Sequence, residues 1–173
     1  IYRDRIPGSN ATVVTKLRKA GAIIIGKLQM HEFALGATSV NPHYGPARNP
    51  WDLSRITGGS SGGSGSSVAS GQCMGALGTD TGGSIRIPAG LCGIVGLKPT
   101  FGRVSRHGVF PLSWTMDTVG PMTRTVEDSA TLLSAMAGFD PLDPGSANVP
   151  LEDFAVNIGK DVSKMKIGVP QEY

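Results

Sequence analysis

The chain has 173 residues and a formal net charge of +3, with 39% hydrophobic and 17% charged residues. This length fits about one domain, and the composition excludes a disordered acidic tail and a coiled coil. The sequence has no apolar run of about 18 residues, so it predicts no transmembrane span. Because the basic residues are few and scattered, the charge gives no reason to expect direct contact with a nucleic acid.

Two cysteines, Cys73 and Cys92, are too few for a disulfide scaffold. They fit a reducing compartment, so we expect a cytoplasmic location. The first residue is Ile1 rather than Met, no signal peptide follows it, and residues 166–170 have the pattern of a strand entering a sheet. We therefore expect the chain to be a piece of a longer protein.

Apolar spacing predicts helices and strands in alternation. A helix is expected after Asn10, a candidate N-cap, and it ends at Gly21, with a short buried strand over residues 22–25. The next expected elements are a short helix over residues 28–35, a helix start over 68–73, a strand over 74–77, a helix over 85–91 and a strand over 94–97. Such an order is typical of a layered α/β fold.

Residues 125–137 carry the clearest helical pattern. Thr125 and Asp128 form a start that resembles a capping box, and Gly138 provides a stop signal. We expect this helix to pack an apolar side against the core.

The middle of the chain has an unusual composition. Residues 58–67 are five glycines and five serines, which is typical of a flexible linker. However, Asp80 and Arg86 are the only charged residues from 56 to 97, where the chain average predicts about seven. This lack of charge predicts interior polypeptide, in which glycine permits close backbone packing. Buried serines need hydrogen-bond partners, so serines among glycines beside one acid and one base predict an active site.

Several known motifs fit this region poorly. No lysine follows the glycines as a phosphate-binding loop requires, and no GxGxxG follows a strand. Residues 58–62 match the spelling of a nucleophile elbow, but the one downstream histidine, His107, lies in a polar turn. Residues 80–82 spell the aspartic-protease triplet, yet such sites need two carboxylates. No Cys, His or acidic residues show ligand spacing, so we expect no metal and no other cofactor.

The residues do support serine nucleophilic catalysis without histidine. A lysine can act as the base when burial lowers its pKa. The backbone N–H groups of residues 81–84 can form an oxyanion hole, because glycines leave them open to a substrate oxygen. For Asp80 and Arg86 we expect a structural ion pair.

Long motifs in this region and on both sides of it resemble the amidase signature family. They are GGSSGGS over residues 58–64, ALGTDTGGSIR over 76–86, GIVGLKPT over 93–100, GKLQMHEF over 26–33, GPARNPW over 45–51 and DTVGPMTRTVED over 117–128. The resemblance implies an α/β amidase signature fold, with a mixed β-sheet flanked by helices. Residues 1–173 would be an incomplete central portion of that domain, without its N-terminal lysine segment and its C-terminal part.

The family mechanism uses a Ser–Ser–Lys triad, and the resemblance assigns two of its members here. Ser84 matches the nucleophile, and Ser60 matches the bridging serine, which follows a cis peptide bond in the family. The resemblance also assigns substrate-binding positions, namely Thr81, Gly82 and Gly83 in the oxyanion hole and Ala34 near the acyl pocket. In the implied reaction, Ser84 attacks the carbonyl, Ser60 passes its proton, and water releases the acyl-enzyme.

The catalytic lysine of the family has no counterpart in this sequence. Lys27 matches a different lysine of the family, for which a structural role at a strand end is expected. Without its base Ser84 is a weak nucleophile, so we expect residues 1–173 alone to be inactive.

Three functions remain open at this point. The first is an amidase that hydrolyses small-molecule amides, which residues 31–36 and 111–114 favour and which we prefer. The second is the glutaminase-type A subunit of an amidotransferase forming Gln-tRNA(Gln) or Asn-tRNA(Asn), which residues 154–161 and 166–170 favour. The third is a non-catalytic interaction module. Partner subunits are expected for the second function, a homodimer is left open, and contact with a membrane is not expected.

Overall fold

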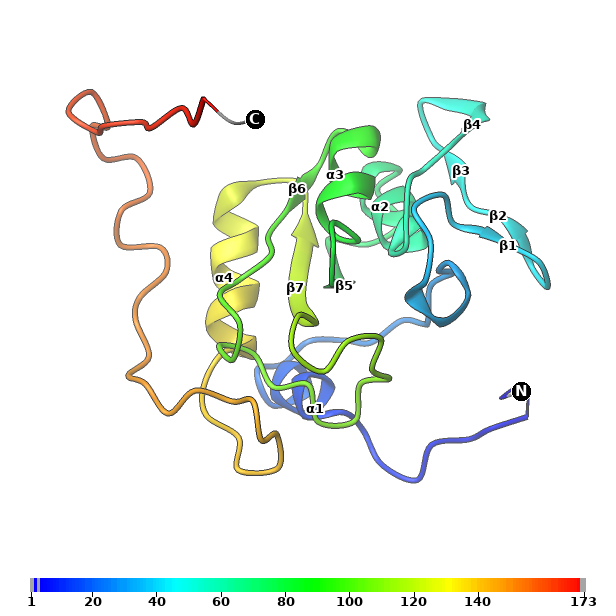
Figure 1. Cartoon of the computed structure of the whole chain (residues 1–173), viewed down its shortest axis with the longest axis horizontal. Coiled ribbons are helices and arrows are strands. Elements are labelled where there is room, and N and C mark those ends of the chain that lie inside the picture. The colour runs from blue at the N-terminus through cyan, green and yellow to red at the C-terminus, as the bar shows by residue number, and fades with distance from the viewer. Residues whose placement is uncertain (1, 3, 172–173) are drawn as a thin grey trace.

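A three-stranded antiparallel sheet forms the centre of the computed structural model, which describes residue 2 and residues 4–171 (Figure 1). The strand order is β5–β7–β6, and the bounds are Gly75–Asp80 for β5, Val95–Gly96 for β6 and Thr118–Thr123 for β7. Every residue of the middle strand β7 is buried. Asp80 pairs with Thr118, so the last residue of β5 lies beside the first residue of β7.

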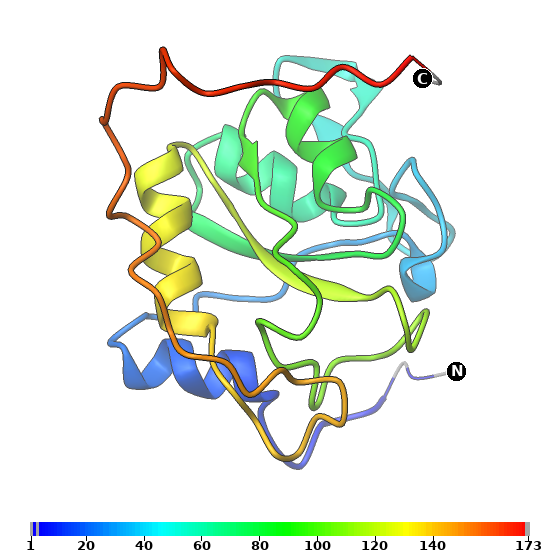
Figure 2. The same cartoon turned by 60° about the vertical axis from the view of Figure 1, so that its left-hand side comes forward.

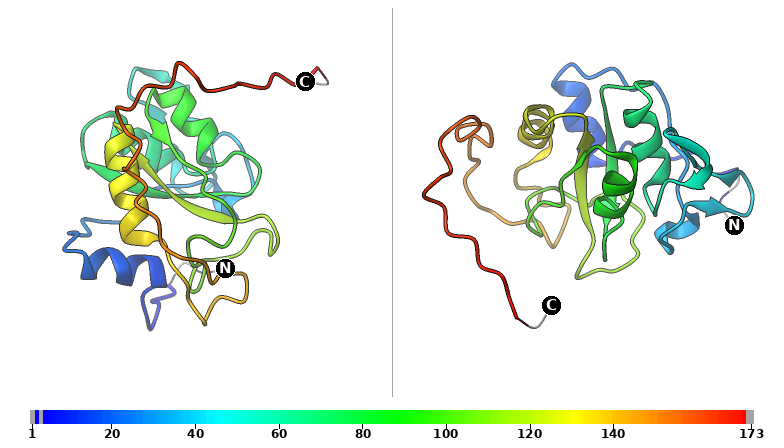
Figure 3. Two further views of the ribbon diagram at one scale, coloured as in Figure 1. Left: turned by 90° about the vertical axis from the view of Figure 1, so that its left-hand side faces the viewer. Right: turned by 90° about the horizontal axis from the view of Figure 1, so that it is seen from above.

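Helices cover both faces of this sheet (Figures 2 and 3). Their bounds are Thr12–Lys19 for α1, Gly62–Ala69 for α2, Arg86–Cys92 for α3 and Val126–Met136 for α4. α4 lies on one face with α1 packed against it, and α2 and α3 lie on the other face. Val119 and Met136 belong to the core on the α4 side, while Ile85 and Met122 belong to the core on the α3 side. The expected α/β class with flanking helices is therefore present.

Four short strands and one 3-10 turn lie outside this sheet. They are η1 (Glu32–Ala34), β1 (Val40–Asn41), β2 (Gly45–Pro46), β3 (Arg48–Asn49) and β4 (Asp52–Ile56). β1 pairs with β2, and β3 pairs with β4. Every ladder in the described residues is antiparallel, so the parallel pairs of the expected mixed sheet do not occur there. Nor does that part of the chain contain a helix long and apolar enough to cross a membrane.

The tract of glycines and serines is a buried helix rather than a linker, as its lack of charge predicted. α2 begins at Gly62, six residues before the expected helix start at residue 68. A Cβ atom at Gly62 would overlap the hydroxyl of Ser39, and one at Gly63 would overlap the backbone of Gln29. Glycine is therefore required because the helix backbone packs directly against other chain segments.

The predicted helix over residues 125–137 is confirmed as α4. The Asp128 N–H donates to Thr125 Oγ1 at 3.1 Å, which is the expected N-cap contact. Gly138 follows the helix with a φ of 114°, a conformation that glycine adopts readily. The helix and the two strands expected over residues 74–97 are also present as α3, β5 and β6.

Two helix predictions need correction. Asn10 does not cap α1, because the N-cap residue is Ala11, and the Thr12 N–H donates to the His107 carbonyl at 3.1 Å. A carbonyl from a distant loop thus satisfies a donor for which a local side chain was expected. The helix expected over residues 28–35 shrinks to the single turn η1.

Two predicted strands are not formed in the described residues. Residues 22–25 and 166–170 have no ladder partner, and Ile23 and Ile167 are 88% and 87% exposed. Apolar β-branched residues favour a strand only where a neighbouring strand accepts the backbone hydrogen bonds. The local pattern was thus insufficient to place these two segments in a sheet.

Lys16 secures the C-terminal end of α4. Its Nζ donates to the carbonyls of Ala137 at 2.8 Å and Gly138 at 3.0 Å, groups that have no partner within the helix. Burial lowers the pKa of Lys16, and the nearby charge of Asp140 partly offsets that shift. We expect Lys16→Met, which keeps the apolar stem, to lower the free energy of unfolding by about 1–2 kcal/mol.

Urea-induced unfolding measures this effect. Lys19→Met is the matched control, because Lys19 ends the same helix and is exposed. We expect the control to change the free energy of unfolding by less than about 0.5 kcal/mol. Equal losses in the two variants would contradict the assignment.

Candidate active site

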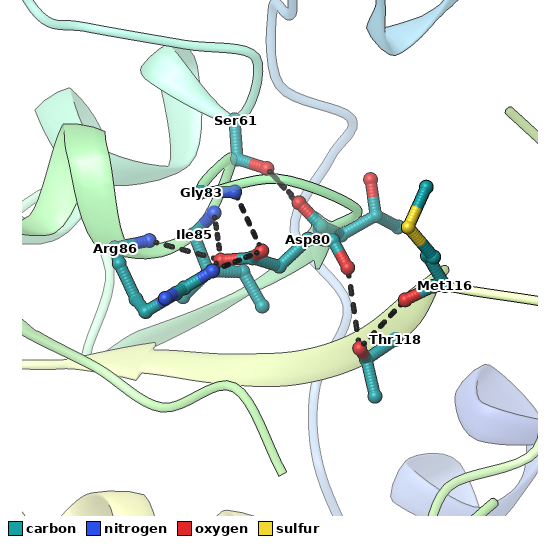
Figure 4. A network of polar contacts seen from close by, with 8 residues as sticks. Ser61, Asp80, Gly83, Ile85, Arg86, Met116 and Thr118 are labelled. Atoms are coloured by element: carbon teal, nitrogen blue, oxygen red, sulfur yellow. Dashed lines mark hydrogen bonds and ion pairs between the residues drawn. The ribbon is translucent and has the colours of Figure 1, made fainter. Parts of the chain in front are cut away.

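Residues 81–84 form a tight turn between β5 and α3, and the Asp80 carboxylate holds this turn in place. Asp80 is fully buried, and it accepts the N–H groups of Gly83 at 2.7 Å and Ile85 at 3.1 Å. It also accepts Nε and Nη2 of Arg86, each at 3.0 Å (Figure 4). The expected ion pair is thus confirmed, and its acidic partner organises the backbone of the turn.

The environment of Asp80 keeps its carboxylate ionised. Burial, the largest single influence, acts to raise the pKa of Asp80. The hydrogen bonds from Arg86, Ile85 and Gly83 together outweigh burial and lower the pKa below its ordinary value. A charged acceptor forms stronger hydrogen bonds than a neutral one, so the hydrogen bonds that lower this pKa are also the ones that hold the turn.

The same turn presents free backbone donors. In the described part of the chain, no acceptor takes the N–H groups of Thr81, Gly82 or Ser84. Gly83, which the family resemblance places in the oxyanion hole, differs from them because its N–H donates to Asp80. Free donors around a single turn can bind a developing negative charge on oxygen. The donors open to a substrate here are therefore those of Thr81, Gly82 and Ser84.

Ser60 contributes a second hydroxyl to this region. The peptide bond between Gly59 and Ser60 is cis, as the resemblance implied. Ser60 is completely buried, and its Oγ has no hydrogen-bond partner among the described residues. A buried unpaired polar group costs about 1–3 kcal/mol, and Ser60 Oγ shares this state with Ser129 Oγ of α4. Ser60 differs from Ser129 in its position, because its neighbour Ser61 donates to the Ser84 carbonyl.

Ser61 ties the glycine-rich tract to the turn. Its backbone N–H donates to the Ser84 carbonyl at 3.2 Å. Its Oγ donates to the Thr79 carbonyl at 3.3 Å and accepts the Thr79 N–H at 3.1 Å. Ser61 thus fixes the segment carrying Ser60 against both the end of β5 and the segment carrying Ser84.

Ala34 reaches the same region through the segment that precedes it. The His31 N–H donates to the Ser60 carbonyl at 3.0 Å, so η1 begins directly beside Ser60. Phe33 and Ala34 have φ angles of 53° and 59°, which residues other than glycine rarely adopt. Such a conformation persists where the surrounding structure enforces it, often in binding sites.

A cavity of about 570 Å³ with a largely apolar lining lies beside β5 and the start of β7, where Thr79 and Val119 line it. Its lining includes Phe101, Val109, Phe110, Trp114, Leu142 and Asp117. The Arg106 guanidinium lies 4.5 Å from the Phe101 ring centre, bonds to Asp143, and donates to the Trp114 carbonyl at 2.7 Å. Asp117 also accepts the Thr81 hydroxyl. In the sequence, Asp117 lies within the motif over residues 117–128, and the family resemblance implies no role for it.

The family model described as Amidase matches residues 1–173. The chain belongs to the amidase family. The match confirms the family resemblance that the motifs around residues 58–100 carried.

Two solved relatives of this chain share its fold, and a curated relative is similar to it in sequence. It is 56% identical over 169 residues to the A subunit of the glutamyl-tRNA(Gln) amidotransferase of Maridesulfovibrio salexigens, covering 96% of this chain and 35% of that protein. The solved glutamyl-tRNA(Gln) amidotransferase A subunit from Thermotoga maritima has a TM-score of 0.83 at 46% identity, covering 85% of this chain and 32% of that one. A native peptide amidase from Stenotrophomonas maltophilia has a TM-score of 0.79 at 43% identity, covering 84% and 31% respectively. The chain thus spans about a third of the length of these relatives.

Proposed function

We propose that this chain carries the amide-cleaving serines of an amidotransferase A subunit that releases ammonia from glutamine. The observation that carries the proposal is the set of free N–H groups of Thr81, Gly82 and Ser84, together with the buried, unpaired hydroxyl of Ser60, whose neighbour Ser61 is hydrogen-bonded to the Ser84 carbonyl. The choice of glutamine departs from our expectation of a general amidase. It is supported by the curated relatives, among them amidotransferase A subunits to which the chain is 56% identical over 169 residues and 53% identical over 173 residues.

The proposed reaction begins when Ser84 Oγ attacks the carboxamide carbon. The proton of Ser84 passes to Ser60 Oγ, and the Thr81 and Gly82 N–H groups bind the oxyanion. Return of a proton through Ser60 to the nitrogen allows ammonia to leave, and water then releases the acyl group from Ser84. Each serine therefore has a distinct task, attack for Ser84 and proton transfer for Ser60.

The base that receives the proton from Ser60 is not found beside it in the described residues. Ser60 Oγ has no partner there, so no lysine in that part of the chain is hydrogen-bonded to it. We propose that residues 1–173 are part of a longer domain, in which a lysine amine hydrogen-bonds this hydroxyl. An amine that is buried at this position would have a lowered pKa, as a general base requires.

A general amidase acting on apolar amides is the alternative function. It is favoured by the cavity that Asp117 lines, because Phe110 and Trp114 on its wall suit an apolar group better than the polar side chain of glutamine. The two functions differ in substrate, while the roles of Ser84 and Ser60 are the same in both.

Ammonia release by the full-length enzyme, purified with any subunits that accompany it, tests the proposal. We expect kcat/KM for glutamine to exceed that for asparagine and benzamide by at least about 100-fold, since a site built for one polar side chain rejects others strongly. A preference for benzamide would overturn the proposal in favour of the general amidase. If the enzyme releases no ammonia from any substrate and a fluorophosphonate does not label Ser84, the proposal fails in favour of an interaction module.

Partners and location follow from the same proposal. An amidotransferase component of this kind would act with partner subunits, so we expect them to co-purify with the full-length chain. The free thiols of Cys73 and Cys92 fit the predicted cytoplasmic location.

A substitution at Gly82 is expected to lower activity without lowering stability. It is exposed, and a Cβ atom added to it would meet no atom within 4 Å. In the proposed reaction, the substrate carbonyl approaches the Gly82 N–H through this open space. We expect Gly82→Ala to lower kcat/KM at least about tenfold while the free energy of unfolding changes by less than about 0.5 kcal/mol.

Ammonia release and urea unfolding, measured side by side, check this expectation. Gly90→Ala is the matched control, because Gly90 is an exposed glycine of α3 whose added Cβ would also meet no atom within 4 Å. Unchanged kcat/KM in Gly82→Ala would exclude this path of approach.

A further inference from the structure

The Asp117 carboxylate connects two loops that are distant in sequence. Asp117 lies immediately before β7 and is 7% exposed. Its Oδ1 accepts the hydroxyl of Thr81 in the turn. Its Oδ2 accepts the N–H groups of Leu112 at 2.7 Å and Ser113 at 2.9 Å, which belong to the segment walling the cavity.

Asp117 differs in its partners from two other buried carboxylates around the site, Asp80 and Asp143. Those two are paired with arginines, whereas no ion pair to Asp117, or to the buried Asp140, is found among the described residues. Burying a carboxylate with neutral donors alone is costly. A carboxylate at this position therefore calls for a reason beyond joining two loops, which a neutral side chain could also do.

The contact with Thr81 supplies such a reason. Threonine has few χ1 states because it is branched at Cβ, so fixing its hydroxyl fixes the side chain against the backbone. The free N–H of Thr81 is one of the proposed oxyanion donors, and such donors act only when correctly placed. A strong acceptor on the Thr81 hydroxyl thus orients the residue whose N–H receives the charge.

We propose that Asp117 is a positioning residue that aligns Thr81 for oxyanion binding and couples this alignment to the cavity-wall segment 110–114. The inference rests on the proposed amide-cleaving function. Asp117 contacts the reacting atoms only through Thr81. A shift of segment 110–114 would therefore move the Asp117 carboxylate and, with it, the Thr81 residue whose N–H binds the oxyanion.

Asp117→Asn and Thr81→Val in the full-length enzyme, with its accompanying subunits, test the inference. Each is expected to lower kcat about 30- to 100-fold with less than about threefold change in KM, because the loss falls on the transition state. Affinity for an aldehyde analogue of the substrate, which forms a tetrahedral adduct on serine, is expected to fall by the same factor as kcat. The double variant is expected to lose no more than the worse single variant, since both remove one contact.

Two further variants distinguish positioning from stability. Thr81→Ser, which keeps the hydroxyl, is expected to recover most of the kcat lost in Thr81→Val. Asp140→Asn is the matched control, because Asp140 is also buried and accepts the Ser105 hydroxyl at 2.6 Å. We expect Asp140→Asn to lower the unfolding free energy while kcat stays within about twofold.

Three outcomes would overturn the inference. They are unchanged kcat in Asp117→Asn, additive losses in the double variant, and an equal fall of kcat in Asp140→Asn. If Asp117→Asn does not fold, Thr81→Val and Thr81→Ser decide alone, and equal kcat values for them would overturn the inference. Failure of the proposed function would instead appear in the wild-type enzyme, as a different preferred amide. The variants are then compared on that amide.

Discussion

Ser84→Ala is expected to reduce amide turnover at least about 10⁴-fold, the scale seen when the nucleophile of a serine hydrolase is removed. Ser60→Ala is expected to reduce kcat about 10²- to 10⁴-fold, the usual contribution of a proton-transfer group. Both expectations follow from the free N–H groups around Ser84 and from the buried, unpaired Oγ of Ser60. A fluorophosphonate is expected to label Ser84 in the full-length enzyme, as peptide mapping would show.

Ser64→Ala is the matched control for this pair. Ser64 lies in the same glycine-rich tract and is buried, but its Oγ donates to the Leu77 carbonyl at 2.7 Å. Its loss is expected to lower the unfolding free energy by about 1 kcal/mol while kcat stays within about twofold. If Ser60→Ala behaved like Ser64→Ala, or if the probe labelled another serine, the catalytic assignments would be wrong.

Asp80→Ala is expected to have the largest effect on stability, about 2–4 kcal/mol, because it leaves the N–H groups of Gly83 and Ile85 without an acceptor. The ion pair itself adds less, since the Arg86 side chain is 55% exposed and its charge can be solvated. Arg86→Met is therefore expected to lower the unfolding free energy by at most about 1 kcal/mol. Urea unfolding at pH 7 measures both variants, and equal losses would show that the ion pair, not the amide bonds, holds the turn.

The same carboxylate predicts how stability depends on pH. The pKa of Asp80 is lowered in the folded state, because its hydrogen bonds outweigh the effect of burial. The Asp80 carboxylate therefore contributes fully to the free energy of unfolding above its unfolded pKa of about 4. This contribution is lost as the pH falls below that value towards the pKa of the folded state. The pKa values of Asp140 and Asp143 are lowered as well. For both groups, burial is the largest single influence and acts to raise the pKa, but the hydrogen bonds together outweigh it. Wild-type protein is expected to lose stability steeply below about pH 4, and Asp80→Asn less steeply.

Local sequence features predicted the buried middle of the chain and α4 better than the segment over residues 22–25. The lack of charge from residue 56 to 97 correctly indicated buried chain, and the Thr125 cap correctly placed α4. The start of α2 was missed because Gly62 has low intrinsic helix propensity, and tertiary packing overrides that propensity here. Residues 22–25 were predicted as a strand from apolar character alone, which cannot show whether a neighbouring strand is present.

For the site, the family resemblance located Ser60 and Ser84 as candidates but gave no contacts. The Gly83 N–H was expected to face the substrate, yet it donates to Asp80, because a charged acceptor three residues away competes for it. Asp117 was overlooked for a different reason. Its partner Thr81 lies 36 residues earlier in the chain, a separation that no local pattern encodes.

The close packing of α2 has a consequence for how this sequence can vary. Residues 58–67 contain only two residue types, and a complexity filter would treat them as a spacer that tolerates almost any change. Yet one methyl group at Gly62 or Gly63 would overlap neighbouring atoms, so even alanine is excluded without a shift of the backbone. The segment has few residue types because its close packing leaves no room for larger side chains. It is therefore among the parts of the chain that tolerate substitution least.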